Sequence, residues 1–298
     1  MPGEIIVLVN PAARGGRSRR LLPPVLDRLR RGGRKVSVVL GSCAADALER
    51  ARVAVARRPA ALVAFGGDGL VHLAVQAVAG TGVPLGIVPA GTGNDIADAL
   101  GIPPRDPLAA ADTVLRGRVR TVDAATVGAP GAAAGSGEWF AGVVACGFDS
   151  RVNERANRLT WPPGMAKYLV ALAGELRAFR PIPFEIDLDG EVVEREAMLV
   201  AVGNTRSYGA GMRVCPDALP DDGLLDVMIL GAVPKTEFLR TFPRVYRGSH
   251  VGHPAVTVRR ARRVGIRAPD VIAYADGERV GPAPLTCEIV PGALSVIV

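Results

Sequence analysis

The stretch from Phe65 to Asp95 reads FGGDGLVHLAVQAVAGTGVPLGIVPAGTGND, and it decides the fold class. The apolar run Ala61–Phe65 predicts a strand that enters a glycine-rich turn at Gly66–Gly69. Apolar residues at helical spacing follow, and a second predicted strand, Leu85–Val88, enters another glycine-rich turn that ends at Asp95. Two strands that each lead through a glycine turn into a helix predict an open α/β sheet, with its ligand site at the carboxyl ends of the strands.

Both turns have the composition of a phosphate-binding loop. Glycine lets main-chain N–H groups approach phosphate oxygens, and helix N-termini favour anions. Asp68 lies in the first turn and Asp95 ends the second. A carboxylate beside phosphate donors is useful when Mg²⁺ bridges them, because Mg²⁺ prefers oxygen ligands. The pattern predicts a nucleotide site with a metal ion. The alternative for each aspartate is a helix N-cap without a ligand.

The chain divides into two parts of different character. Residues 1–123 alternate strands and helices, which indicates a parallel sheet covered on both faces. The predicted strands there are Ile5–Val9, Lys35–Leu40, Ala61–Phe65 and Leu85–Val88, and the predicted helices include Leu21–Arg31, Ala44–Arg57 and Pro107–Arg116. Residues 124–298 are strand-like and turn-rich after Pro183. We expect an N-terminal α/β domain and a β-rich second domain, and the last strand is a candidate to return to the first domain.

The boundary between the two parts is a predicted hairpin. Val119–Gly128 reads as a strand, Gly128–Glu138 as a loop of small residues, and Trp139–Asp149 as a second strand. Helical spacing then covers Arg151–Phe179, interrupted by two prolines. The amphipathic part of this segment is expected to pack on the core, and the functional interpretation is a wall of a lipid cleft.

Composition narrows the range of functions. The chain has 298 residues, 49% of them hydrophobic, enough to fill two cores, and its four cysteines and three histidines form no cluster with metal-ligand spacing. Neither a secretion signal nor a membrane-spanning stretch is visible, so we expect a cytoplasmic protein. The net charge of +7 favours contact with anionic membrane. An aromatic content of 4%, with no recognisable nucleic-acid motif, argues against nucleic acid as a partner.

The ordered series of motifs resembles the catalytic domain of the diacylglycerol kinase and sphingosine kinase superfamily, and most closely the bacterial diacylglycerol kinase-like lipid kinases. The motifs are Asn10-Pro11, GGDG, PAGTGND, GFD at Gly147–Asp149, VGNTRSYGAGMRVCPDALPDDGLLDV at Val202–Val227, and Asp276-Gly277-Glu278. The resemblance covers nearly the whole chain. It implies an NAD kinase/diacylglycerol kinase-like fold and an ATP- and Mg²⁺-dependent lipid kinase with its active site in the cleft between the domains.

The resemblance assigns nucleotide contacts to the turn after the first strand and to both glycine turns. The implied ATP-binding residues are Asn10, Pro11, Arg14, Gly66, Gly67, Asp68, Gly69, Gly91, Thr92, Gly93 and Asn94. Taken alone, Asn10-Pro11 is equally well explained as an ordinary turn between a strand and a helix. The chain departs from the commonest family pattern at Leu70, where threonine is usual, so a hydroxyl that could bond phosphate is missing.

The resemblance places the general base in the motif Asp276-Gly277-Glu278. An alcohol that attacks a γ-phosphate loses its proton, and a carboxylate within hydrogen-bond reach accepts it. We expect Glu278 to be this base, with Asp276 orienting it or serving in its place. Asp68 completes the expected catalytic residues. Without the resemblance, the motif is also a plausible hairpin turn.

Two magnesium sites are implied. Asp68 and Asp95 would hold the catalytic Mg²⁺ and its waters. A second, structural Mg²⁺ would bind the carboxylate of Asp222 and the backbone carbonyls of Leu219 and Leu224. The alternative for this second segment is a plain turn rich in aspartate and glycine.

The implied reaction is phosphorylation of diacylglycerol to phosphatidic acid. A sphingoid base or phosphatidylglycerol is an alternative acceptor. An NAD kinase-like enzyme and a non-catalytic lipid- or nucleotide-binding protein are the rival functions. We expect a lipid alcohol and the anionic membrane surface as partners, with a peripheral membrane location. The sequence leaves the oligomeric state open, a homodimer included.

Overall fold

The computed structural model describes residues 3–9, 16–132, 135–162 and 165–298. Its N-terminal part is built on four neighbouring parallel strands, whose order in the sheet is β4-β3-β1-β2. They are β1 (Ile5–Val9), β2 (Val36–Leu40), β3 (Ala61–Gly66) and β4 (Leu85–Pro89). Three of the strands are buried along their whole length, as expected for parallel strands covered on both faces.

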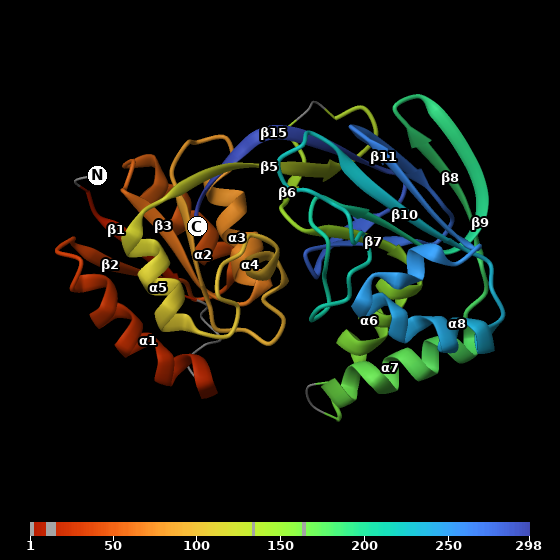
Figure 1. Cartoon of the computed structure of the whole chain (residues 1–298), viewed down its shortest axis with the longest axis horizontal. Coiled ribbons are helices and arrows are strands. Elements are labelled where there is room, and N and C mark those ends of the chain that lie inside the picture. Colours follow the sequence, from red (N-terminus) through yellow and green to blue (C-terminus); the bar gives the residue numbers. More distant parts are fainter. Residues whose placement is uncertain (1–2, 10–15, 133–134, 163–164) are drawn as a thin grey trace.

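Helices surround these strands (Figure 1). They are α1 (Gly16–Arg30), α2 (Ala44–Ala56), α3 (Asp68–Val78), α4 (Asp95–Ala99) and α5 (Pro107–Arg116). The guanidinium of Arg28 in α1 binds both carboxylate oxygens of Asp112 in α5, at 2.5 and 2.9 Å. Helix α1 begins five residues before its predicted start and tolerates two prolines inside it.

The C-terminal part is dominated by antiparallel strands. They are β7 (Val143–Gly147), β8 (Ile182–Leu188), β9 (Glu191–Gly203), β10 (Leu225–Gly231), β11 (Val256–Ala261), β12 (Arg263–Arg267), β13 (Ile272–Ala275) and β14 (Glu278–Pro282). Their apolar side chains form a second hydrophobic core, separate from that of the N-terminal part. The expected fold class, a parallel α/β part followed by a β-rich part, is confirmed.

Two long strands join the parts. β5 (Val119–Gly128) and β15 (Leu285–Ile297) pair antiparallel over almost their whole length, and both cross the top of the molecule in Figure 1. Near its end, β15 pairs in parallel with β4, through Val296 and Leu85. Along β5, the side chain of Ala124 belongs to the first core and that of Ala125 to the second. The two parts therefore share one continuous sheet.

The strand predicted at Trp139–Asp149 is wrong in its extent, because the structure has two separate strands there. β6 (Glu138–Phe140) pairs with β5, but the chain then passes to β7, which pairs with β9 and β13. Gly147 ends β7 with φ of 103°, and a Cβ there would lie 2.7 Å from the carbonyl oxygen of Met198. Only glycine fits this bend, and the chain turns at once into α6 (Phe148–Arg158).

Helices also cover one side of the C-terminal part (Figure 1). They are α6, α7 (Met165–Ala178), α8 (Lys235–Thr241) and the short 3₁₀ helices η2 (Phe242–Arg247) and η3 (Ser249–Gly252). The segment from α8 to η3 was not predicted from the sequence, because its helices are short and carry no strong apolar period. Phe238 and Phe242 from this segment stack with ring centroids 5.7 Å apart.

Candidate active site

The two glycine-rich turns touch each other through their backbones. β3 and β4 are parallel neighbours, so the turns that follow them lie side by side. A Cβ on Gly91 would lie 2.5 Å from the Cα of Gly67, closer than real Cβ atoms approach. The glycines therefore allow the two turns to pack together.

Asp68 ties the first turn to the second. Its carboxylate accepts the N–H groups of Asn94 (2.8 Å) and Ile96 (3.2 Å), so it caps the start of α4. Burial raises the pKa of Asp68, the backbone hydrogen bonds oppose this shift, and the nearby carboxylate of Asp276 adds to it. The N-cap role that the sequence offered as an alternative is real, although the helix that is capped is α4 and not the aspartate's own.

Asp95 links the two parts of the molecule. Its carboxylate oxygens accept the N–H groups of Ala210 and Gly211, both at 2.7 Å, from the loop after β9. Burial raises the pKa of Asp95, the bond from Ala210 opposes the shift, and the charge of Asp68 raises it again. A Cβ on Gly93 would lie 2.9 Å from Asp68 Oδ2 and 3.0 Å from Asp95 Oδ2. Two carboxylates this close repel each other, and a bound cation would relieve the repulsion, so the pair fits Mg²⁺.

The remaining predicted nucleotide residues fall into three groups. Asn94 is buried with φ of 61°, and its amide binds the backbone of Gly91 and the carbonyl of Pro104, so it shapes the second turn. Thr92 is exposed and lines a cleft between the two parts. Asn10, Pro11 and Arg14 lie outside the described residues.

Asp276 is buried and its hydrogen-bond capacity is used up. Oδ1 accepts the N–H groups of Gly142 (2.8 Å) and Val143 (3.2 Å). Oδ2 accepts the N–H of Ala141 at 3.1 Å and lies 3.1 Å from Nδ1 of His72. The side chain has no exposed surface. Asp276 therefore fixes the turn between β13 and β14 and has no oxygen left to take up a proton from a ligand.

Glu278 stands at the other end of the same turn, and its carboxylate is accessible. Its Oε1 lies 2.5 Å from the position that a Cβ on Gly69 would occupy, so the carboxylate lies directly over the first glycine turn. Within the described part of the chain, this side chain makes no hydrogen bond. The two acids of the motif thus differ in environment, a difference that the sequence could not predict.

Two cavities meet at this turn. The first is a cleft of about 480 Å³ between the two parts, whose lining includes Asp68, Thr92, Gly93, Asp95, Leu169, Leu172, Tyr208, Met212, Phe242 and Asp276. The second, of about 690 Å³, is bordered by Ser42, Leu48, Gly69, Leu73, Glu138, Glu278 and others. The walls of both include adjacent residues of the first glycine turn and of the turn at residues 276–278. The two cavities therefore border the same two turns, and Glu278 borders the second cavity.

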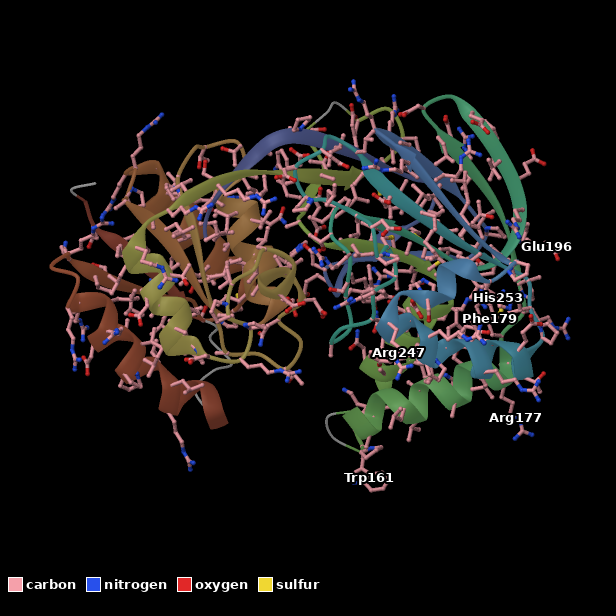
Figure 2. The ribbon with its side chains drawn as sticks, viewed as in Figure 1. Trp161, Arg177, Phe179, Glu196, Arg247 and His253 are labelled. Atoms are coloured by element: carbon pink, nitrogen blue, oxygen red, sulfur yellow. The ribbon has the colours of Figure 1, made fainter. Side chains whose placement is uncertain are left out.

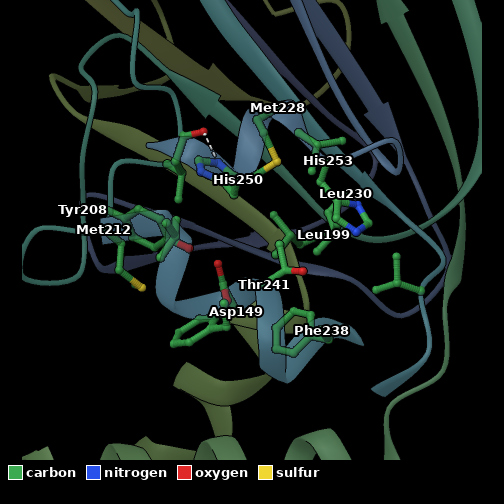
Figure 3. Close-up of a pocket in the computed structure, with 15 residues that line it drawn as sticks. Asp149, Leu199, Tyr208, Met212, Met228, Leu230, Phe238, Thr241, His250 and His253 are labelled. Carbon is green, nitrogen blue, oxygen red and sulfur yellow. Dashed lines mark hydrogen bonds between the residues drawn. The ribbon is translucent and has the colours of Figure 1, made fainter. Parts of the chain in front are cut away.

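A third, apolar cavity extends from the cleft into the C-terminal part (Figure 3). Tyr208, Met212 and Phe242 line both. Burial raises the pKa of Asp149, which borders this cavity, to about 7. Among the described residues, the Tyr208 hydroxyl and Nδ1 of His250 find no hydrogen-bond partner. The enclosed volume is about 50 Å³, well below the ~150 Å³ that holds benzene in an engineered cavity.

The arrangement around Asp222 does not fit the implied structural Mg²⁺. The guanidinium of Arg260 in β11 pairs with Oδ2 of Asp222, and Oδ1 accepts the N–H of Leu224 at 3.2 Å. Arg260 Nε also lies 3.5 Å from Oδ2 of the buried Asp226. A positive side chain already occupies the place beside this carboxylate, so Asp222 has its counter-charge without a metal shared with Leu219 and Leu224.

His72 and Glu138 belong to the site, although no motif in the sequence singled them out. Nε2 of His72 lies 2.9 Å from Oε1 of Glu138, while Nδ1 faces Asp276. Burial alone would lower the pKa of His72, but the hydrogen bonds to Asp276 and Glu138 outweigh it and raise the pKa to about 10. No local pattern marks these residues, because their partners lie on elements far apart in the sequence.

Comparison with known proteins gives a consistent result. The family model of the diacylglycerol kinase catalytic domain matches residues 4–127, and that of the YegS C-terminal NAD kinase beta sandwich-like domain matches residues 142–298. Diacylglycerol kinase of Mycobacterium tuberculosis is 41% identical over 296 residues, which are 99% of this chain and 95% of the relative. Diacylglycerol kinase of Bacillus subtilis is 31% identical over 282 residues, which are 93% of this chain and 90% of the relative.

Solved structures share the fold. A diacylglycerol kinase from Bacillus anthracis superposes with a TM-score of 0.73 at 21% identity, covering 99% of this chain and 96% of the other. An NAD kinase from Archaeoglobus fulgidus in complex with ATP has a TM-score of 0.53 at 13% identity, covering 99% and 93%. Within the described residues, no helix is long and apolar enough to cross a membrane. The family resemblance seen in the motifs is confirmed, and the chain belongs to the diacylglycerol kinase family of lipid kinases.

Proposed function

We propose that this chain transfers the γ-phosphate of ATP to the hydroxyl of diacylglycerol, with Mg²⁺ as cofactor. The observation that carries the proposal is the accessible carboxylate of Glu278, which lies over Gly69 where two cavities meet. The curated relatives that match nearly the whole chain are named diacylglycerol kinase, which supports this acceptor over other lipid alcohols.

ATP is proposed to bind with its phosphates against the two glycine turns. The donors would be the unbonded N–H groups of the two glycine turns and the hydroxyl of Thr92, while the N–H of Gly91 already donates to Oδ1 of Asn94. The base and ribose would occupy the cavity bordered by Leu48 and Leu73. Asp68 and Asp95 would hold Mg²⁺, which neutralises phosphate charge when it is bound.

The chain's own residues account for the proton transfer. Glu278 accepts the proton of the lipid hydroxyl while the hydroxyl oxygen forms a bond to the γ-phosphorus. The bond between that phosphorus and the bridging oxygen breaks, and ADP leaves. Asp276 is a positioning residue in this scheme, because its oxygens already accept three N–H groups and face His72. The choice between the two acids, open at the level of sequence, falls on Glu278.

The lipid is proposed to enter from the cleft side. Leu169, Leu172 and Phe242 offer apolar surface beside the acids. An acyl chain would continue toward the enclosed cavity of Figure 3, whose present volume requires that lining side chains rotate outward. The apolar wall and the adjacent acids together support a substrate with a hydroxyl head and hydrocarbon tails.

Contact with an anionic bilayer would deliver this lipid. Trp161 is 78% exposed and lies just before α7, Arg177 lies near the other end of that helix (Figure 2), and Leu169 and Val170 between them are about half exposed. Tryptophan favours the membrane interface, and basic residues are attracted to acidic lipids. Sedimentation with phosphatidylglycerol vesicles should weaken with salt and in Trp161→Ala, and equal binding to neutral vesicles would contradict this contact.

The function is tested by transfer of label from [γ-³²P]ATP in the presence of Mg²⁺. Diacylglycerol, a sphingoid base and phosphatidylglycerol are supplied in mixed micelles, with NAD in a parallel reaction and Glu278→Gln as control. Label in diacylglycerol that disappears in the variant supports the proposal. Label mainly in another lipid changes the acceptor, label only in NAD favours the NAD kinase alternative, and ATP binding without any label favours a binding protein.

A further inference from the structure

His72 lies between the active-site turn and the nucleotide cavity. It is on α3, one helical turn after Asp68, and is 4% exposed. Nδ1 faces Oδ2 of Asp276 at 3.1 Å, and Nε2 faces Oε1 of Glu138 at 2.9 Å. A neutral imidazole donates from only one nitrogen, so two carboxylate partners require both nitrogens to carry hydrogen. The amide nitrogen of Gln76 also lies 3.3 Å from Nε2, but it donates to the carbonyls of Trp139 and His72. The geometry therefore describes an imidazolium between two carboxylates.

Gln76, one helical turn after His72, fixes the position of Glu138 beside the imidazole ring. The amide of Gln76 donates to the carbonyl of Trp139 at 2.5 Å and accepts the N–H of Trp139 at 2.9 Å. This pair of bonds fastens β6 to α3 and keeps Glu138 beside His72. Glu138, His72 and Gln76 all border the cavity assigned to the nucleotide. The contact with His72 is thus built into the packing of β6 against α3.

The charge of His72 matters to both carboxylates. The side chain of Asp276 is wholly buried, and it lies close enough to Asp68 to raise the pKa of Asp68. Asp276 and Glu138 approach the ring of His72 from opposite sides. A protonated His72 offsets one of their charges and supplies the only side-chain donor that Asp276 has among the described residues.

We propose that His72 is a positioning residue for phosphate transfer: its imidazolium locks Asp276, and through it the turn that holds Glu278 over Gly69, while Glu138 holds the ring from the nucleotide side. The proposal rests on the role of Glu278 given above. It adds a residue that the family motifs did not single out in this chain.

Two amide substitutions separate the contacts. An asparagine amide reaches the position of Nδ1 and a glutamine amide that of Nε2, so His72→Asn keeps the bond to Asp276 and His72→Gln keeps the bond to Glu138. We expect His72→Gln to lower kcat about 10²-fold with the KM for ATP nearly unchanged, because a small misplacement of a catalytic group has this cost. His72→Asn should retain more of the activity. Equal kcat in His72→Gln and wild type, or equal losses in both variants, would overturn the proposal.

The charge itself is tested with Glu138→Gln. In the described part of the chain, the titratable groups that face His72 are Asp276 on the β13–β14 turn and Glu138 on β6, and Gln76 is neutral. Losing Glu138 lowers the pKa of His72, so kcat should fall at an alkaline pH where the wild type is still flat. Asp112→Asn, which breaks the pair with Arg28 between α1 and α5, is the matched control and should leave the profile unchanged. Parallel profiles for Glu138→Gln and wild type would refute the charged role.

A measurement without substrate separates this proposal from the proposed function. The chain has three histidines, so ring ¹⁵N signals of selectively labelled protein can be assigned with His72→Asn as reference. We expect the His72 ring to keep both protons at pH 8.5. Loss of a ring proton near pH 7 would overturn the proposal, whatever acceptor the enzyme proves to use.

Discussion

The glycine turns of the N-terminal part and the apolar cavity of the C-terminal part are built in opposite ways. At the turns, backbone touches backbone at Gly67 and Gly91, and the side chains of Asp68, Asn94 and Asp95 have partners at 2.7–3.2 Å. In the cavity, the Tyr208 hydroxyl and Nδ1 of His250 have no partner among the described residues, and little free volume is enclosed.

The difference matches the two proposed ligands. A phosphate chain has the same shape and charge at every turnover, so a site with fixed donors binds it without reorganisation. Acyl chains vary in length, and a cavity closed only by side chains can open to different extents. We therefore expect substitutions at the turns to affect catalysis or the stability of the whole protein. Substitutions at the cavity should affect only the side chains around it.

The largest effect is expected at the junction of the two regions. Glu278→Gln removes the proposed base, and general-base catalysis typically contributes about 10²–10⁴-fold to the rate. We expect kcat to fall by that factor, with ATP affinity and thermal stability close to wild type because the carboxylate is exposed and makes no bond within the described chain. Steady-state kinetics and calorimetric titration with ATP check this. A kcat within threefold of wild type would remove Glu278 from the mechanism.

The rigidity of the turns is tested by Gly91→Ala. The added methyl would meet Gly67 at 2.5 Å, and overpacking of this kind costs about 1–3 kcal/mol. Urea unfolding should show that loss together with weaker ATP binding. Gly252→Ala, where nothing lies within 4 Å of the new methyl, is the control and should change neither. A fully stable Gly91→Ala protein would show that the turns have more freedom than the comparison assigns to them.

The cavity is tested through the pH dependence of stability. The pKa of Asp149 is raised to about 7 by burial, above that of an exposed aspartate. Between about pH 4 and 7 the folded protein therefore holds more protons than the unfolded chain, so stability falls as the pH rises through this window. Asp149→Asn should reduce the slope, to which Asp68 and Asp95 also contribute, and gain about 2–4 kcal/mol at pH 8. Parallel stability curves for variant and wild type would indicate an ionised, solvated Asp149.

The smallest effect is expected at the Asp222 loop. Asp222→Asn weakens a partly exposed ion pair with Arg260 and leaves Arg260 beside Asp226, so it should cost about 1 kcal/mol or less. A chelator should stop phosphate transfer and leave the unfolding temperature of the wild type unchanged, because Arg260 and not a metal holds Asp222. Differential scanning calorimetry with and without EDTA decides this. A marked drop in unfolding temperature on chelation would restore the structural magnesium site.

The sequence predicted what depends on local pattern. The parallel strands, both glycine turns and the helix at Pro107–Arg116 follow from apolar runs, glycine and an aspartate cap, all within a few residues. The split between β6 and β7 was missed, because it depends on β7 pairing with β9 and β13, which lie far along the chain, while β6 pairs with β5. Local reading cannot detect such a contact.

The sequence predicted which acidic residues form the site, but it did not predict the role of each one. Asp68, Asp95, Asp276 and Glu278 do gather around one cleft and its neighbouring cavity. That Asp276 is saturated while Glu278 is accessible depends on N–H groups more than 130 positions away. The pairing of Asp222 with Arg260 depends on the register of β10 and β11, which the motif does not contain.

In the proposed mechanism, ATP and the lipid bind in the two cavities, and the γ-phosphate and the lipid hydroxyl meet beside Glu278. A crystal structure with a non-hydrolysable ATP analogue, Mg²⁺ and a short-chain diacylglycerol tests it most directly. We expect the analogue's γ-phosphate at the two glycine turns and the lipid hydroxyl about 2.6–3.2 Å from the Glu278 carboxylate. A lipid hydroxyl held away from Glu278, with the phosphates on the other side of the turns, would contradict it.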